Sequence, residues 1–130
     1  MSTDDFHICS TSDVLLLTFD EDWALDGYKN RFGESLLEHA KEFNDKKWAV
    51  IDDISNWPIK IPEEMEMCNE LATRCVEKGF RHCAVCGQEY AISKWMMNKV
   101  IPNKVEIAYF DSLSEAKNWL SSLGYNTNFQ

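Results

Sequence analysis

Short apolar runs alternate along the chain with longer segments whose apolar residues recur at every third or fourth position. The short runs predict strands, and the spacing of three and four predicts amphipathic helices. Strands are predicted at residues 6–10, 14–19, 46–55, 80–87 and 104–110. Helices are predicted at residues 25–43, 62–79, 90–100 and 112–124. The expected order is therefore β-β-α-β-α-β-α-β-α.

Several predicted helices carry sequence signals at their ends. Pro62 followed by two glutamates suits a helix N-terminus, and Gly79 suits the C-terminal end of the same helix. Ser112 and Glu115 have the spacing of a capping box, and Gly124 follows the last turn. These signals place the helix boundaries independently of the apolar pattern.

The element order predicts an α/β fold. Strands that alternate with helices are joined by right-handed crossovers, which gives a mostly parallel sheet, here of about five strands with four helices. The first strand is expected to pair as an antiparallel edge. We expect a single domain over residues 1–130 with a core at about 6–123, and loose ends at 1–4 and 126–130. Trp48 and Trp119 are expected to lie in the core.

Charge and composition exclude some classes of function. The net charge of −9 disfavours nucleic acid as a partner and disfavours attachment to anionic lipid. The start MSTDDFHICS lacks the basic segment of a signal peptide, and the run VLLL is too short to be transmembrane. Five scattered cysteines fit reduced thiols, so we expect a cytoplasmic protein.

The segment RHCAVCGQEY, residues 81–90, carries a Cys-x-x-Cys pair that is typical of metal or redox sites. However, residues 80–86 must form a strand if the chain is to cross the sheet between Gly79 and Gly87. Side chains alternate along a strand, so Cys83 and Cys86 point to opposite faces and cannot bind one ion together. We predict buried structural thiols, with no metal site and no cofactor. A reactive Cys86 at the strand end stays open as the alternative.

The element order, the element lengths and the ending VEIAYFDSLSEAKNWLSSL resemble the STAS family, in particular its small SpoIIAA-like members. The resemblance covers roughly residues 6–123 and implies a STAS (SpoIIAA-like) fold. It implies non-enzymatic roles as well, either partner switching in signalling or binding of small or apolar ligands.

The chain departs from the pattern of the signalling members in one place. Those members carry a phospho-accepting serine, preceded by aspartate, where the second helix begins. Here that position reads Ile61, Pro62, Glu63 and Glu64, without a hydroxyl, and Ser55 lies earlier, at the strand end. The resemblance therefore does not carry a phosphorylation switch over to this chain.

Ligands of open α/β sheets bind beyond the carboxyl ends of the strands. At that edge the sequence places large apolar side chains in positions where a sheet core does not require them. The candidate ligand-binding residues are Trp23, Trp57, Ile59, Ile61, Trp95 and Met96. The loop 56–61 and the helix 91–100 would form an apolar cleft; alternatively, the loop folds back and caps the core.

Five carboxylates gather at the same edge: Asp20, Glu21, Asp22, Asp52 and Asp53. They could hold a divalent cation, but complementing helix N-termini and lining solvated turns is the interpretation that we favour.

The sequence thus favours a non-catalytic binding or regulatory module that takes a hydrophobic small molecule or a protein partner. A small cytosolic enzyme that uses Cys86 or the carboxylates of Asp52 and Asp53 is the alternative. Peripheral membrane contact and self-association stay open.

Overall fold

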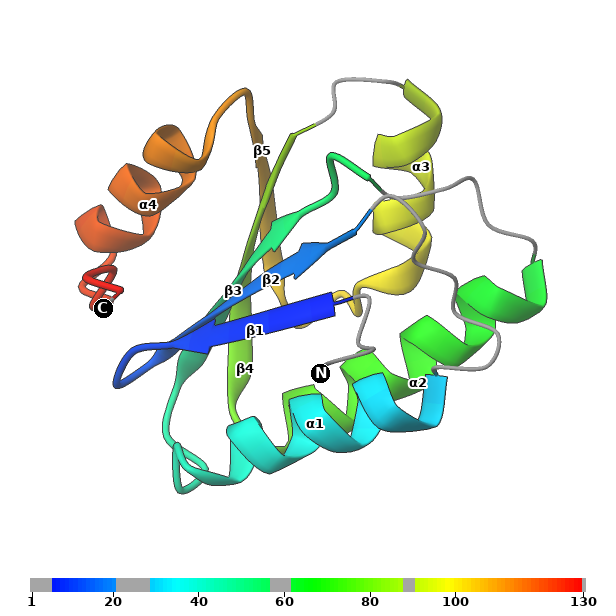
Figure 1. Cartoon of the computed structure of the whole chain (residues 1–130), viewed down its shortest axis with the longest axis horizontal. Helices are drawn as coiled ribbons and strands as arrows, with labels where there is room; N and C mark the ends of the chain where they lie inside the picture. The colour runs from blue at the N-terminus through cyan, green and yellow to red at the C-terminus, as the bar shows by residue number, and fades with distance from the viewer. Residues whose placement is uncertain (1–5, 21–28, 57–61, 88–90, 130) are drawn as a thin grey trace.

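The computed structural model describes residues 6–20, 29–56, 62–87 and 91–129, which form five strands and four helices. The strands are β1 (Phe6–Ser10), β2 (Val14–Phe19), β3 (Trp48–Asp53), β4 (Phe80–Cys86) and β5 (Glu106–Phe110). The helices are α1 (Lys29–Lys41), α2 (Pro62–Glu77), α3 (Ala91–Val100) and α4 (Leu113–Ser122). Figure 1 shows them in the order that the sequence predicts.

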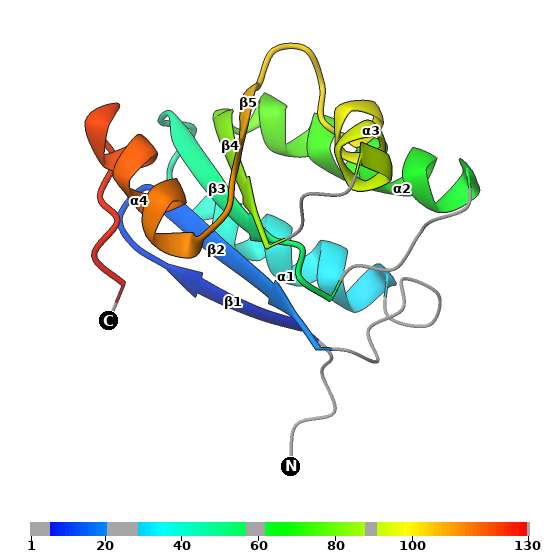
Figure 2. The ribbon, with the colours of Figure 1, turned by 90° about the horizontal axis from the view of Figure 1, so that it is seen from above.

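The strands form one sheet with the order β1-β2-β3-β4-β5. Strand β1 pairs with β2 antiparallel, with Phe6 opposite Phe19, and the other three pairs are parallel. Helices α1, α2 and α3 lie on one face of the sheet and α4 lies on the other (Figures 1 and 2). The predicted α/β architecture and its antiparallel edge are confirmed.

The alternation of side chains in β3 and β4 divides the core into two layers. Val50 and Cys83 belong to the cluster that packs under α1 and α2. Ile51 and Cys86 belong to the cluster under α4. The two cysteines therefore lie on opposite faces of a buried strand, as the sequence predicts.

Trp48 is fully buried where β3 begins. Its ring lies 5.1 Å from the rings of both Phe43 and Phe80, and its Nε1 atom donates a hydrogen bond of 3.0 Å to the Lys78 carbonyl. The core position of Trp48 is confirmed. One side chain thus joins the end of α1, the end of α2 and two strands.

Trp119 differs from the expectation, because it is only partly buried. It packs against the α4 cluster and lies 5.6 Å from the Phe110 ring on β5. Strand β5 is the last of the sheet, so one side of Trp119 has no further strand to cover it. The prediction of a core position for Trp119 is therefore confirmed only in part, because the side chain packs on the core but stays partly exposed.

The chain stays attached to the sheet after α4. Tyr125 is buried, and the Asn126 N–H donates a hydrogen bond of 2.9 Å to Asp13 Oδ1. The Thr11 hydroxyl donates to the Asn126 carbonyl over 2.7 Å. Expecting a loose end from residue 126 onward was wrong at Asn126, because its partners lie more than a hundred positions away in sequence.

Two glycines in different backbone geometries allow a matched test of the fold. Gly33 lies inside α1, where an added Cβ would meet only Leu71 at ordinary contact distance. Gly79 follows α2 with a φ of +110°, and an added Cβ would overlap the Lys46 carbonyl.

Gly33→Ala should raise the free energy of unfolding by about 0.5–1 kcal/mol, since alanine favours the helix. Gly79→Ala should lower it by more than about 1 kcal/mol, because a side chain at positive φ is strained. Denaturant unfolding measures both changes. The same sign for both variants would contradict the backbone geometry described here.

Candidate functional site

The structure bears only partly on the residues that the sequence singles out for binding. Trp23, Trp57, Ile59 and Ile61 lie outside the described residues. On α3, the Trp95 side chain is 50% exposed, whereas the neighbouring Met96 is 1% exposed. Trp95 therefore faces solvent and Met96 faces the protein interior, and the cleft between loop 56–61 and α3 stays a prediction.

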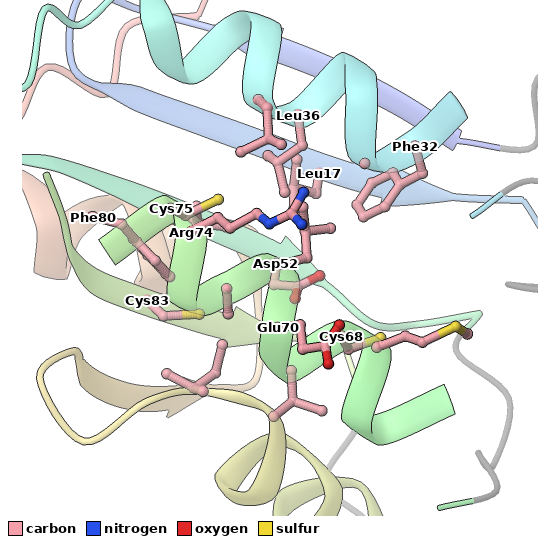
Figure 3. A pocket seen from close by; sticks show the side chains of 18 of the residues that line it. Leu17, Phe32, Leu36, Asp52, Cys68, Glu70, Arg74, Cys75, Phe80 and Cys83 are labelled. Atoms are coloured by element: carbon pink, nitrogen blue, oxygen red, sulfur yellow. The ribbon is translucent and has the colours of Figure 1, made fainter. Parts of the chain in front are cut away.

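A different pocket, of about 490 Å³, lies between α1, α2 and the sheet (Figure 3). Its floor comes from β2, β3 and β4, and its walls come from α1 and α2. Val100 and Ile101 also line it. The apolar lining residues are Leu17, Phe19, Phe32, Leu36, Leu37, Val50, Met67, Leu71, Phe80, Val100 and Ile101. The volume lies within the range of small-molecule sites, roughly 300–1,000 Å³.

Small residues line the pocket on both helices. Gly33 on α1 and Ala72 on α2 line it, and so do Cys68 and Cys75. Large apolar residues at these four positions would fill the space. The sequence did not lead us to this pocket, although a glycine inside α1 and three small residues on the inner face of α2 were the signal that could have revealed it.

The polar groups of the pocket are placed at two depths. Asp52, on β3, is only 6% exposed, and its Oδ1 atom is shielded from solvent. Three exposed charged residues also line the pocket: Glu34 on α1, and Glu70 and Arg74 on α2. Figure 3 shows the Arg74 side chain extending from α2 over the pocket. The site is thus an apolar chamber with a buried carboxylate and a charged rim.

Asp52 and Asp53 do not form a catalytic pair. Consecutive residues of a strand point to opposite faces, and only Asp52 lines the pocket. The Asp53 carboxylate accepts hydrogen bonds from the Ser55 N–H, at 3.1 Å, and from the Ser55 hydroxyl, at 2.6 Å. Asp53 therefore closes the turn after β3.

The buried thiols are held in their protonated form. Burial raises the pKa of Cys75 to about 12. Burial, and then the charges of Asp53 and Asp52, raise the pKa of Cys86 to about 12. The pKa of Cys83 is raised well above its usual value by burial first and by Asp52 second. Because the thiolate is the nucleophile, this environment does not favour an enzyme that uses Cys86.

A second hollow, of about 400 Å³, lies around His82 and Glu106 and is lined by residues of both charges. His82 Nδ1 lies 2.6 Å from the Tyr125 hydroxyl, and its Nε2 lies 3.9 Å from Glu106. Burial lowers the pKa of His82, with an opposing effect of Glu106. His82 thus holds the segment after α4 through Tyr125. The mixed charges around the hollow match no single class of ligand.

The part of the chain that the structure describes has neither a metal-ligand cluster nor a membrane-spanning helix. No three His, Cys, Asp or Glu side chains there are grouped as metal ligands would be. Nor does any helix there have the length and apolar character needed to cross a membrane.

No protein-family model and no curated protein sequence matches the chain. Among solved structures, the chain is similar to RsbS of Moorella thermoacetica, in a variant with a serine-to-glutamate substitution. The TM-score is 0.66 at 16% sequence identity, and the match covers 93% of this chain and 98% of the RsbS chain. RsbS is a STAS-domain protein, so the chain has the STAS (SpoIIAA-like) fold that its sequence predicts.

The thiols provide a direct test of the site. In the native protein, the exposed Cys9 should be alkylated first, and Cys75, Cys83 and Cys86 only after unfolding. A pKa raised from 9.0 to about 12 leaves about a thousandfold less thiolate at neutral pH. Timed alkylation with peptide mass spectrometry measures each rate.

The control for this experiment is Cys9→Ser, which should remove the fast phase and leave the others unchanged. Rapid labelling of Cys86 in the folded protein would contradict the buried environment and restore the enzyme alternative.

Proposed function

We propose that the protein is a non-catalytic regulatory module that binds a small hydrophobic molecule between α1 and α2. The observation that carries this proposal is the apolar pocket of about 490 Å³ over the sheet. Burying an apolar ligand there contributes roughly 25 cal/mol for each Å² removed from water. The raised thiol pKa values and the separate roles of Asp52 and Asp53 argue against catalysis at the same place.

The STAS fold supports a regulatory role as well. STAS proteins are associated with partner switching and with ligand binding, and the structural neighbour RsbS belongs to that group. A ligand between α1 and α2 would set how closely the two helices pack, because small residues line both sides of the gap. A change in helix packing would alter the outer surfaces of α1 and α2, and a protein partner that binds these surfaces would respond to the ligand. The five cysteines, which form no disulfide among the described residues, support a cytosolic setting.

Binding of decanol tests the proposal. Cys68 lines the pocket and is partly exposed, whereas Cys9 lies on β1 outside the pocket. Decanol should therefore slow the alkylation of Cys68 at saturation and leave the rate at Cys9 unchanged. Titration calorimetry on the same samples gives the affinity.

A matched pair of substitutions locates the bound decanol. Ala72→Phe fills the pocket and should weaken decanol binding by about tenfold or more. Thr73→Phe places the same side chain on the exposed face of α2 and should leave the affinity unchanged. Equal affinities of the two variants would show that decanol does not occupy this pocket.

The apolar cleft predicted at α3 is the second candidate site, because Ile92 and Trp95 are 45% and 50% exposed on the same side of that helix. An exposed apolar pair of this kind could contact the apolar side chains of a protein partner, or it could form one side of the predicted cleft. Trp95→Ser distinguishes the two locations. Loss of decanol binding in Trp95→Ser, with full binding in Ala72→Phe, would place the ligand at α3.

A further inference from the structure

We propose that the pocket between α1 and α2 selects a cationic amphiphile, with its apolar chain between the helices and an ammonium group against the Asp52 carboxylate. This inference rests on the proposed function and specifies the chemical class of the ligand.

The position of Asp52 is the first argument. In the part of the chain that the structure describes, Asp52 and Ser93 are the buried polar side chains, and Asp52 is the one that lines the pocket. Removing a carboxylate from water is unfavourable unless charged or hydrogen-bonding groups compensate. Asp52 has interactions within the protein, and on the wall of an apolar chamber a positively charged ligand would add to that compensation.

Asp52 can bind such a group in addition to its interactions within the protein. A carboxylate has about four acceptor positions, and an ammonium group supplies three donors. The hydrogen bonds between them are charge-assisted and form here in surroundings of low dielectric constant, where they are stronger than in water. The polar contact fixes the head group, and the apolar walls accept the chain.

The rim of the pocket also favours a positively charged ligand. Glu34 and Glu70 contribute two negative charges, and Arg74 contributes one positive charge. All three are exposed, so water screens them and their individual effects are small. Together with the net charge of −9, the rim disfavours an anionic head group such as a fatty-acid carboxylate.

The field of Asp52 reaches the pocket wall. Its charge is the second cause, after burial, of the raised pKa of Cys83, whose side chain lines the same chamber. The negative charge of Asp52 would likewise attract a cation bound in this chamber.

The experiment compares three ligands with the same chain: decylamine, decanol and decanoate. Decylamine carries an ammonium group at neutral pH, as a lysine side chain does. Wild-type protein should bind decylamine about tenfold or more tightly than decanol, and decanoate the least tightly. The preference should persist at high salt, because a buried pair is screened much less than an exposed one.

Asp52→Asn and Asp53→Asn form the matched pair. Each removes one negative charge from the same strand, but Asp53 closes the turn with Ser55 and does not line the pocket. In Asp52→Asn the ratio of decylamine to decanol affinity should fall to about one, with decanol binding retained as the sign of an intact pocket. In Asp53→Asn the ratio should stay at its wild-type value.

The outcomes separate this inference from the proposed function. If wild-type protein binds none of the three ligands, both fail. If decanol binds and decylamine binds no more tightly, the inference alone is overturned. If Asp53→Asn lowers the ratio as much as Asp52→Asn, the preference comes from net charge and the inference is overturned too. Should Asp52→Asn not fold, the order of the three ligands on wild-type protein decides.

Discussion

The structure depends on strand β3, which is buried on both faces by the helices of a mostly parallel sheet. Trp48 begins this strand and connects it to the ends of α1 and α2 through ring packing and the hydrogen bond to Lys78. Because the residues from Trp48 to Asp52 are all buried, any polar group among them is placed inside the protein. Asp52 is that group, and its position follows from the strand's register.

The same alternation of faces decides which chemistry the chain can support. Cys83 and Cys86 lie in different layers of the core, and Asp52 and Asp53 face different sides of β3. Neither pair converges on one point, so neither has the geometry that paired ligands or paired acid and base groups require. The pocket instead combines an apolar chamber with one buried carboxylate, and the proposed binding function rests on this arrangement.

The likeness to RsbS concerns the fold, since the two chains share 16% of their residues. Folds host many functions, and function is determined by the site. In this chain the candidate site is the space lined by Gly33, Cys68, Ala72 and Cys75 between two helices of the STAS fold. Regulation by an amphiphile would use that space without altering the architecture.

The sequence was enough to predict the order of the elements and the opposite faces of Cys83 and Cys86, because both follow from local periodicity. It was also enough to predict the mostly parallel sheet and its antiparallel edge, because these follow from rules of chain connection. The tertiary structure decided the pocket, the partial exposure of Trp119 and the attachment of Asn126 to the turn between β1 and β2. Periodicity shows which side of an element is buried. How closely two helices approach, and what covers an edge strand, depends on side chains from elements far apart in the chain, so only the folded protein determines them.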